Sequence, residues 1–209
     1  MNGVESIRHS LPRQLLQALR LTGVIFVVTG LVYTLAITGI SQLIFHDQAN
    51  GSLLNRNGRV AGSSLIGQEF TDPRYFFGRP SASNNDAGTS PQPYNAENSG
   101  GSNLAPSNKV LIARIKKAVA QVRKDNGIDA TTPVPVDLVT TDFSGFDPDI
   151  TEAAALIQVK RVARARGLDS NRVQALVQKY VQGRVLLVFG EPHVNVLALN
   201  LALNDGEAG

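Results

Sequence analysis

The residues best suited to chemistry in this chain are three histidines and a group of aspartates, and their spacing forms no recognised catalytic motif. His9, His46 and His193 lie far apart, and neighbouring residues complete neither an HExxH helix nor a serine triad. The four aspartates between 137 and 149 lack the alternating positions and distant glutamate of a calcium loop. The chain has no cysteine, which excludes disulfides and sulfur-bound zinc. We therefore expect no catalytic residue and no bound metal.

Two glycine-rich segments share features with phosphate-binding loops. Residues 62–68 (GSSLIGQ) have the glycine spacing of a P-loop, but Gln68 stands where a lysine would neutralise phosphate. Residues 99–103 (SGGSN) could present several backbone N–H groups to an anion. A flexible glycine-rich turn is the simpler interpretation of the second segment.

Charge gives little support for nucleic-acid binding. The 209 residues include 20 Lys and Arg against 17 Asp and Glu, so the net charge is only +3. These basic residues are spread along the chain, whereas nucleic-acid binders concentrate them on one face. We therefore expect no nucleic-acid partner.

An uncharged apolar segment, residues 21–45, predicts a membrane-spanning helix. Its 25 residues would form a helix of roughly 37 Å, enough to cross a hydrocarbon core of about 30 Å. A cleaved signal peptide is the alternative, but its apolar region is usually shorter and ends in a small-residue cleavage site, which FHDQ is not. The sequence therefore predicts a retained, single-pass helix in the plasma (inner) membrane.

The charges around this segment predict its orientation. Arg8, Arg13 and Arg20 precede it, against a single Glu5, and the positive-inside rule places such a tail in the cytoplasm. We expect a cytoplasmic tail over residues 1–20 and an extracytoplasmic domain over residues 46–209. Within the span, Gly23, Gly30, Thr34 and Thr38 recur near one helical stripe, where another helix could approach closely.

The remaining sequence predicts an α+β domain rich in helices. Residues 46–62 read as a polar stalk, 64–70 as a short strand and 83–108 as a long functional loop pinned by Tyr94 and Leu104. Apolar residues at helical spacing predict helices that begin at the caps Ser107, Thr151, Asp169 and Asn195, the first three ending near Gly127, Gly167 and Val181.

The predicted domain contains two further segments with a clear residue pattern. Residues 184–189 (RVLLVF) predict a buried strand between two glycines. The basic residues of the second predicted helix are expected to form its solvated face: Lys160, Arg161, Arg164 and Arg166.

Several blocks of the sequence together resemble a known family. In order they read SSLIGQEF, YFFGRPSAS, NSGGSNLAPSN, PVDLVTTDFSGFDPDIT, QVKRVARARGL and GEPHVNVLALNLAL, after a short basic tail and one apolar span. In this order and spacing the chain resembles the C subunit of the bacterial potassium-transporting P-type ATPase, the Kdp complex. The resemblance runs from the span to about Leu203.

The resemblance implies an accessory, non-catalytic subunit of a potassium import complex. Its partners would be a channel-like, pore-forming subunit and a phosphorylated P-type ATPase subunit, besides the lipid bilayer. The chain itself has neither a DKTGT phosphorylation motif nor a TVGYG-like filter. The family is described as a catalytic chaperone that raises the ATP affinity of the ATPase subunit. That description implies ATP contacts at Gln68, Ser99, Gly100, Gly101, Ser102 and Asn103, with no cofactor bound firmly.

ATP contact conflicts with the predicted orientation, because ATP is cytoplasmic and the domain is predicted to be exported. We therefore expect the exported domain to dock over the outer mouth of the pore-forming subunit. The small-residue stripe would belong to the interface, and so would six residues of the domain: Tyr75, Phe76, Arg79, Ser144, Gly145 and Asp147. Three alternatives stay open. They are a membrane-tethered envelope enzyme, a binding module unrelated to transport and a cytoplasmic ATP-binding chaperone.

Overall fold

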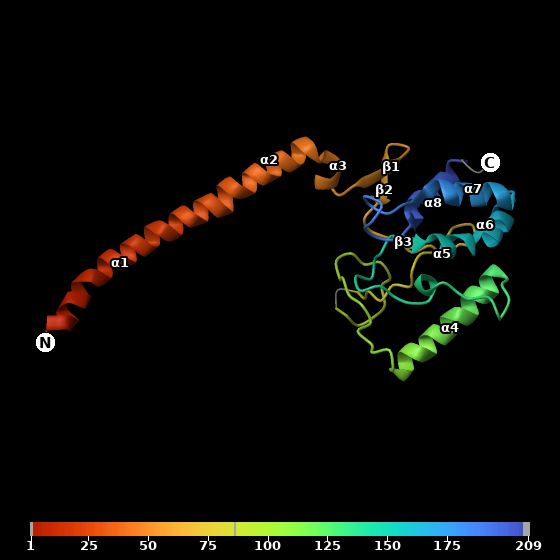
Figure 1. Ribbon diagram of the computed structural model, residues 1–209, viewed down its shortest axis with the longest axis horizontal. Coiled ribbons are helices and arrows are strands. Elements are labelled where there is room, and N and C mark those ends of the chain that lie inside the picture. Colours follow the sequence, from red (N-terminus) through yellow and green to blue (C-terminus); the bar gives the residue numbers. More distant parts are fainter. Residues whose placement is uncertain (1, 86, 207–209) are drawn as a thin grey trace. The chain divides into compact units, whose positions relative to one another are not determined.

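A computed structural model describes residues 2–85 and 87–206, with the side chains of the N-terminal helix described from Leu11 onward. The chain forms two units, one up to Ser52 and one from Leu53 (Figure 1). Met1 of the predicted tail and residues 207–209 of the predicted exported domain lie outside the described residues. The architecture is α+β, as the sequence predicts, with one long apolar helix followed by helices and short strands.

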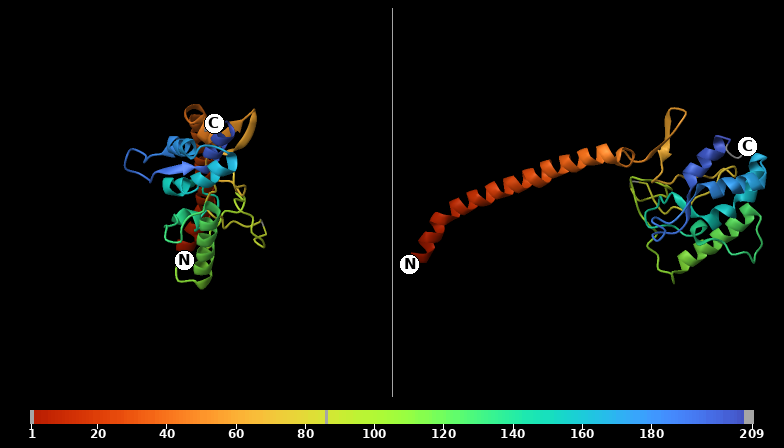
Figure 2. Two further views of the ribbon diagram at one scale, coloured as in Figure 1. Left: turned by 90° about the vertical axis from the view of Figure 1, so that its right-hand side faces the viewer. Right: turned by 45° about the horizontal axis from the view of Figure 1, so that its top comes forward.

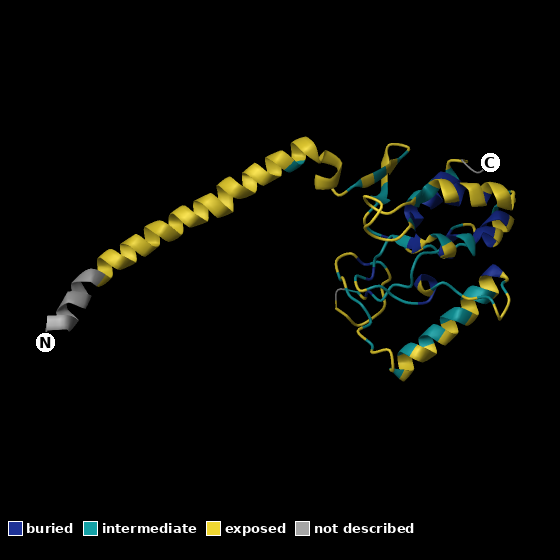
Figure 3. Ribbon diagram, in the orientation of Figure 1, coloured by how far each residue is buried: buried dark blue, intermediate teal, exposed yellow. Residues whose placement is uncertain are grey.

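The first unit is a nearly continuous helix. It comprises α1 (Asn2–Phe26), a π-helical segment (Val27–Tyr33) and α2 (Thr34–Ile44), followed by the short α3 (His46–Ala49). One helical stretch in the described part of the chain is long and apolar enough to cross a membrane, Leu11–Ile44. Its side chains lie exposed along almost the whole length (Figure 3). The helix therefore begins well before the predicted span and includes much of the predicted tail.

The π-helical segment changes the geometry of the small-residue stripe. Gly30 lies inside it, and the Thr34 hydroxyl donates to the carbonyl of Thr29, five residues back, at 3.3 Å. A π-turn holds more residues than an α-turn, so it shifts the angular register between Gly23 and the pair Thr34 and Thr38. The predicted stripe assumed a constant period of 3.6 residues.

The predicted stalk over residues 46–62 is wrong in detail, because it contains a hairpin. Strands β1 (Leu53–Arg56) and β2 (Arg59–Ser63) pair antiparallel, with Arg56 opposite Arg59. The two turn residues, Asn57 and Gly58, have φ of 50° and 73°. Positive φ at both positions is what a tight hairpin turn requires, and Asn-Gly is the sequence that adopts it most readily.

Helices α4 to α8 build the second unit. They are α4 (Lys109–Asn126), α5 (Glu152–Leu156), α6 (Val159–Arg166), α7 (Ser170–Tyr180) and α8 (Val196–Asn204), with a 3₁₀ turn at Val136–Leu138. Thr151, Asp169 and Asn195 cap α5, α7 and α8 as predicted, each accepting a hydrogen bond from a backbone N–H. The cap of α4 is Asn108, one residue after the predicted Ser107.

The predicted second helix is divided into α5 and α6, at Ile157 and Gln158. Between its parts the backbone N–H of Gln158 donates to the carbonyl of Ala155, three residues back, at 3.0 Å. This tighter turn separates the two helices, and the side chain of Gln158 lies buried at the bend.

A small antiparallel sheet joins the helices. Its order is β3 (Asp149–Thr151), β5 (His193–Asn195) and β4 (Val181–Gln182), with Ile150 and Val181 both opposite Val194. Most buried side chains of the core come from this sheet and from α5–α8 (Figure 3). Helix α4, by contrast, has intermediate and exposed residues along most of its length.

Two predicted strands are wrong. Residues 64–70 form a turn and extended chain, whose one cross-chain backbone bond in this stretch joins the Gly67 N–H to the Phe146 carbonyl at 2.8 Å. Residues 184–189 form an exposed turn, closed by a single backbone pairing of Val185 with Phe189. That residues 83–108 form a loop is confirmed over the described residues, in which Asn84 pairs with Pro91 and no helix or longer strand occurs, while a function for this loop stays a prediction.

Side chains of Gln158, Arg161 and Asn200 hold the segment Pro73–Phe77, in which a turn closed by the Tyr75 N–H and the Asp72 carbonyl is followed by extended chain with Phe76 in the core. Asn200 accepts from the backbone N–H of Phe76 at 2.8 Å and donates to its carbonyl at 2.9 Å. Gln158 does the same for Phe77, at 2.8 and 3.1 Å. Each amide side chain thus takes the place of a neighbouring strand, since it satisfies both polar groups of one residue.

Arg161 of α6 completes these ties and is not on a solvated face, so that expectation is wrong. Its guanidinium donates to the carbonyls of Pro73 and Tyr75 at 2.6 and 2.9 Å, and lies 3.9 Å from the ring centre of Phe77. It also donates to Asn126 at the end of α4 at 3.0 Å. Burial lowers the pKa of Arg161 to about 10, so the group stays charged at neutral pH.

We expect Asn200→Ala to lower the free energy of unfolding of the second unit by about 3 kcal/mol, because both backbone groups of the buried Phe76 lose their partner. Denaturant unfolding of the full chain in detergent, followed by circular dichroism, measures this loss. Asn171→Ala on the exposed surface of α7 is the matched control and should change the value by less than about 0.5 kcal/mol. Equal effects of the two substitutions would contradict the strand-like role of Asn200.

Candidate functional site

Four of the residues predicted to form an interface lie together in a cluster of loops, namely Arg79, Ser144, Gly145 and Asp147. This loop cluster comprises the segments 79–83, 94–95, 99–101 and 142–147 of the second unit. Ser81 donates to the carbonyl of Gly145, and Gly100 donates through its backbone to the carbonyl of Ser144 at 2.9 Å. Ser99 donates to the same carbonyl at 3.1 Å. Segments about 45 residues apart in the sequence are therefore bonded to one another.

Asp142 and Asp147 organise one side of the loop cluster. The carboxylate of Asp142 accepts from the backbone N–H groups of Ser144 and Gly145, both at 3.0 Å. Asp147 forms an ion pair with Arg79 at 3.2 Å, in which both side chains are about one quarter exposed. Such a partly buried pair is worth more than a fully exposed one, because solvent screens it less.

Tyr94 pins the long loop to this cluster, as the sequence predicted. Its hydroxyl donates to the carbonyl of Arg79 at 2.6 Å, and its backbone N–H donates to the Ser81 hydroxyl at 3.0 Å. A side chain on Gly67 would meet the Tyr94 ring at 2.5 Å, so glycine there makes room for the ring. Burial first, and then the carboxylates of Asp142 and Asp147, raise the pKa of Tyr94, which keeps the phenol protonated as a donor.

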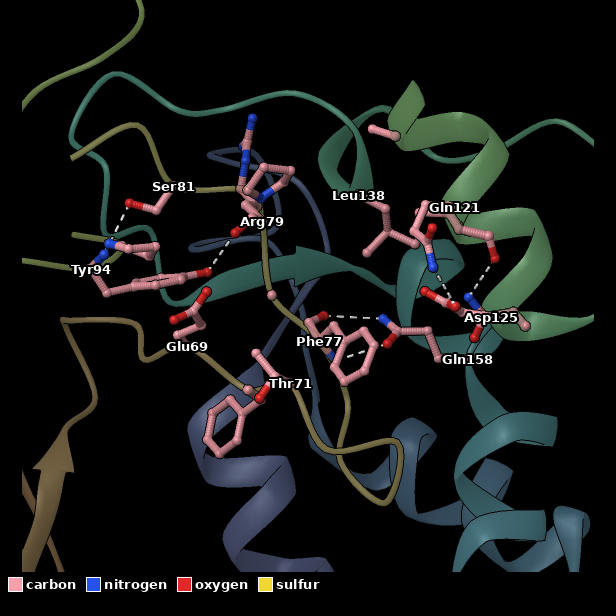
Figure 4. Close-up of a pocket in the computed structure, with 17 residues that line it drawn as sticks. Glu69, Thr71, Phe77, Arg79, Ser81, Tyr94, Gln121, Asp125, Leu138 and Gln158 are labelled. Carbon is pink, nitrogen blue, oxygen red and sulfur yellow. Dashed lines mark hydrogen bonds between the residues drawn. The ribbon is translucent and has the colours of Figure 1, made fainter. Parts of the chain in front are cut away.

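A pocket of about 490 Å³ lies beside the loop cluster, between α4 and the segment 69–81 (Figure 4). Glu69, Phe77 and Tyr94 line one wall, while Gln121 and Asp125 reach into it from α4. The carboxylate of Asp125 accepts a hydrogen bond from the Gln121 amide at 2.7 Å. The Gln158 amide also lines the pocket and donates to the carbonyl of Phe77 at 3.1 Å. The lining residues include no pairing of a nucleophile with a base. This pocket is therefore better suited to binding an apolar group than to catalysis.

The residues predicted to contact ATP lie in three separate places. Ser99 and Gly100 bond within the loop cluster, and Gly101 packs against the backbone of Phe143. Ser102 and Asn103 line a different, smaller pocket of about 180 Å³ beside α4. The Gln68 side chain donates to the carbonyl of Ala61 in β2 at 2.9 Å. Nucleotide binding by this set stays a prediction.

The predicted aromatic contacts differ in their exposure. Phe76 is fully buried in the core, so its ring supports the segment from within. Tyr75 is partly exposed, with its ring 5.5 Å from that of Phe70 and 4.9 Å from the guanidinium of Arg166. Of the three consecutive aromatic residues Tyr75, Phe76 and Phe77, only Tyr75 and Phe77 keep accessible surface.

Sequence reasoning missed the residues that hold the site in place, namely Gln158, Arg161 and Asn200. A usable signal was present, because a glutamine and an asparagine sat on otherwise apolar helix faces, where polar side chains are normally hydrogen-bonded. In the described part of the chain no three His, Cys, Asp or Glu side chains gather closely enough to hold a metal ion.

Gly145 should be the most sensitive position of the loop cluster. We expect Gly145→Ala to lower the free energy of unfolding by about 2 kcal/mol, because its φ is +84° and a Cβ would meet the Gly100 carbonyl at 2.8 Å. Gly100→Ala is the control, since a Cβ there meets nothing within 4 Å. Denaturant unfolding compares the two variants, and an equally harmless Gly145→Ala would argue against a tightly packed cluster.

Comparisons with known proteins place the chain in a family. The family described as "K+-transporting ATPase, c chain" matches residues 15–205. A protein of Paraburkholderia phytofirmans named "Potassium-transporting ATPase KdpC subunit" is 53% identical over 186 residues, which cover 89% of this chain and 93% of that protein. A protein of the same name from Bradyrhizobium diazoefficiens is 51% identical over 201 residues, covering 94% and 98%. The resemblance predicted from the sequence blocks is confirmed, and the chain belongs to the KdpC family of K+-transporting ATPase c chains.

Proposed function

We propose that this chain is an accessory, non-catalytic subunit of an ATP-driven potassium import complex. It assembles with a pore-forming, channel-like subunit and a P-type ATPase subunit, and it stabilises their complex. The observation that carries this proposal is the family match over residues 15–205, which includes both the apolar helix and the loop cluster. The names of the relatives, subunits of a potassium-transporting ATPase, point the same way.

The N-terminal helix supports the role of a single-pass anchor. Leu11–Ile44 presents apolar side chains on all sides, so a membrane or neighbouring helices must cover them. Basic residues are confined to its N-terminal part, which favours a cytoplasmic N-terminus in the plasma membrane. Gly30, Thr34 and Thr38 would then contact helices of the partner subunits, and Gly23 would do so from another angle, because the π-helical segment lies between Gly23 and Thr34.

The loop cluster supports a role in docking. It is built from irregular chain but is held by many side-chain hydrogen bonds, so it keeps one shape without a partner. A preorganised surface loses less conformational entropy on binding than a mobile loop. Arg79, Tyr75, Ser144 and the residues around them would then contact the extracytoplasmic face of the pore-forming subunit.

An indirect effect on ATP turnover fits the geometry better than direct nucleotide contact. The six residues implied for ATP lie in three separate places, and the Gly100 amide of the predicted anion loop is already bonded. In this proposal the subunit raises the activity of the ATPase by stabilising the assembled complex. Contact with ATP would need the second unit to lie in the cytoplasm.

Deletion of the gene for this chain should abolish growth at micromolar potassium, because the complex would not assemble. A plasmid copy should restore growth, and the wild-type chain should copurify with two larger membrane proteins. Growth in media of graded potassium concentration measures the effect. Normal growth of the deletion strain at limiting potassium, with the transporter genes expressed, would contradict the proposal.

A topology reporter separates docking outside the cell from ATP contact inside it. We expect alkaline phosphatase fused to the C-terminus to be active, because this enzyme folds only after export. A fluorescent protein at the same position should be dark, because it does not fold correctly once it has been exported. The reverse pattern would place the loop cluster in the cytoplasm and favour a nucleotide-binding chaperone. Fusions at the N-terminus serve as the control and should give the opposite result.

A further inference from the structure

The turn over Val185–Phe189, here called the apolar tip, exposes five consecutive large apolar residues. Leu186 and Leu187 are 79% and 90% exposed, and the other three residues of the tip are each 64% exposed or more. In Figure 2, left, the blue chain between α7 and α8 extends from the helices as a loop. A soluble surface rarely carries such a patch without a partner, and single exposed residues such as Phe143 are more usual.

Most backbone N–H groups of the apolar tip are bonded within the turn. Val185 and Phe189 exchange backbone hydrogen bonds at 2.9 Å, and Leu187 and Val188 donate to the carbonyls of Arg184 and Val185 at 3.2 Å. Four of its five amides therefore need no water. An ion pair of Arg184 with Glu191, at 2.7 Å, closes the base with polar groups.

The sequence of the apolar tip conflicts with its local conformation. Leu186 and Leu187 have φ of 52° and 64°, a region that residues other than glycine, asparagine and aspartate disfavour. The β1–β2 hairpin of the same chain meets the same demand with Asn57 and Gly58, at φ of 50° and 73°. Leucine at such positions is explained best by what the side chains contact.

These features fit a lipid environment. All five side chains are exposed, so the turn is apolar on both faces, whereas a knob for a protein pocket needs one apolar face and a polar rim. Lipid also favours backbone groups that are bonded internally, as four of the five N–H groups of the tip are here. The eight residues 45–52 between the apolar helix and the second unit reach at most about 28 Å, so a membrane-embedded helix would put the start of this unit within that distance of the bilayer.

We propose that the apolar tip inserts into the boundary between headgroups and acyl chains of the same bilayer that holds the N-terminal helix. The Arg184–Glu191 pair then lies at headgroup level, and the apolar helix and the tip restrain the second unit at two points. This inference needs the helix to be membrane-embedded, but it does not depend on which side of the membrane the second unit occupies or on the transport role.

Tryptophan fluorescence tests the proposal directly, because the chain contains no tryptophan. Phe189→Trp places one reporter in the apolar tip, and Phe143→Trp places the matched reporter on an exposed loop of the same unit. The full chain is reconstituted alone in vesicles of phosphatidylcholine and phosphatidylglycerol, with and without brominated acyl chains. We expect blue-shifted emission quenched by brominated lipid for Phe189→Trp, and unshifted, unquenched emission for Phe143→Trp.

A second variant removes the two most exposed apolar side chains of the tip, Leu186 and Leu187, without disturbing the turn. In the Phe189→Trp background, L186N/L187G introduces the residues that the β1–β2 turn uses, so the thermal midpoint should stay the same or rise while the quenching disappears. If this variant unfolds, the comparison of the two single reporters still decides the question.

Equal, unquenched emission from both reporters in vesicles would overturn the proposal. If Phe189→Trp then became shielded only in the purified transporter complex, the tip would contact a protein subunit instead of lipid. Quenching of Phe189→Trp together with normal growth of the deletion strain would leave the membrane contact standing and refute the transport role alone.

Discussion

The second unit depends on the need to satisfy buried backbone groups where the chain has no regular secondary structure. Between β2 and α4 no strand or helix spans the described residues, yet Phe76 lies fully buried. A buried N–H or C=O without a partner costs about 1–3 kcal/mol. Asn200, Gln158 and Arg161 meet this requirement from the helices, so the extended segment is fixed on a rigid scaffold.

The same constraint extends from the core to the loop cluster. Phe77, held by Gln158, is two residues before Arg79, whose carbonyl receives the Tyr94 hydroxyl. Tyr94 in turn fixes the long loop, and Gly100 joins that loop to Ser144. Hydrogen bonds that alternate with short stretches of chain therefore connect Gln158 and Asn200 to the surface proposed for docking, which explains how a polar, irregular loop keeps a defined shape.

The sequence was informative where local chemistry decides structure, and less so where tertiary contacts do. Thr151, Asp169 and Asn195 were recognisable as caps because one side-chain oxygen meets one nearby N–H. The position of Arg161 was predicted wrongly because helical periodicity cannot show that two backbone carbonyls, the Asn126 amide and an aromatic ring surround its guanidinium. The loop cluster joins segments that no local pattern links, and only the family resemblance brought Arg79, Ser144 and Asp147 together in advance.

The hairpin turn and the apolar tip are two segments that were predicted wrongly from the sequence, for different reasons. Asn57-Gly58 is a strong turn signal that was overlooked in a segment read as a stalk, so the information was present. The run RVLLVF gives the opposite case, because its composition satisfies every rule for a buried strand and the structure nevertheless exposes it. Composition reports that these side chains avoid water, but it does not say what covers them. For a unit joined by eight residues to a candidate membrane helix, the protein core is one apolar environment, and the bilayer is the other in the proposal made above.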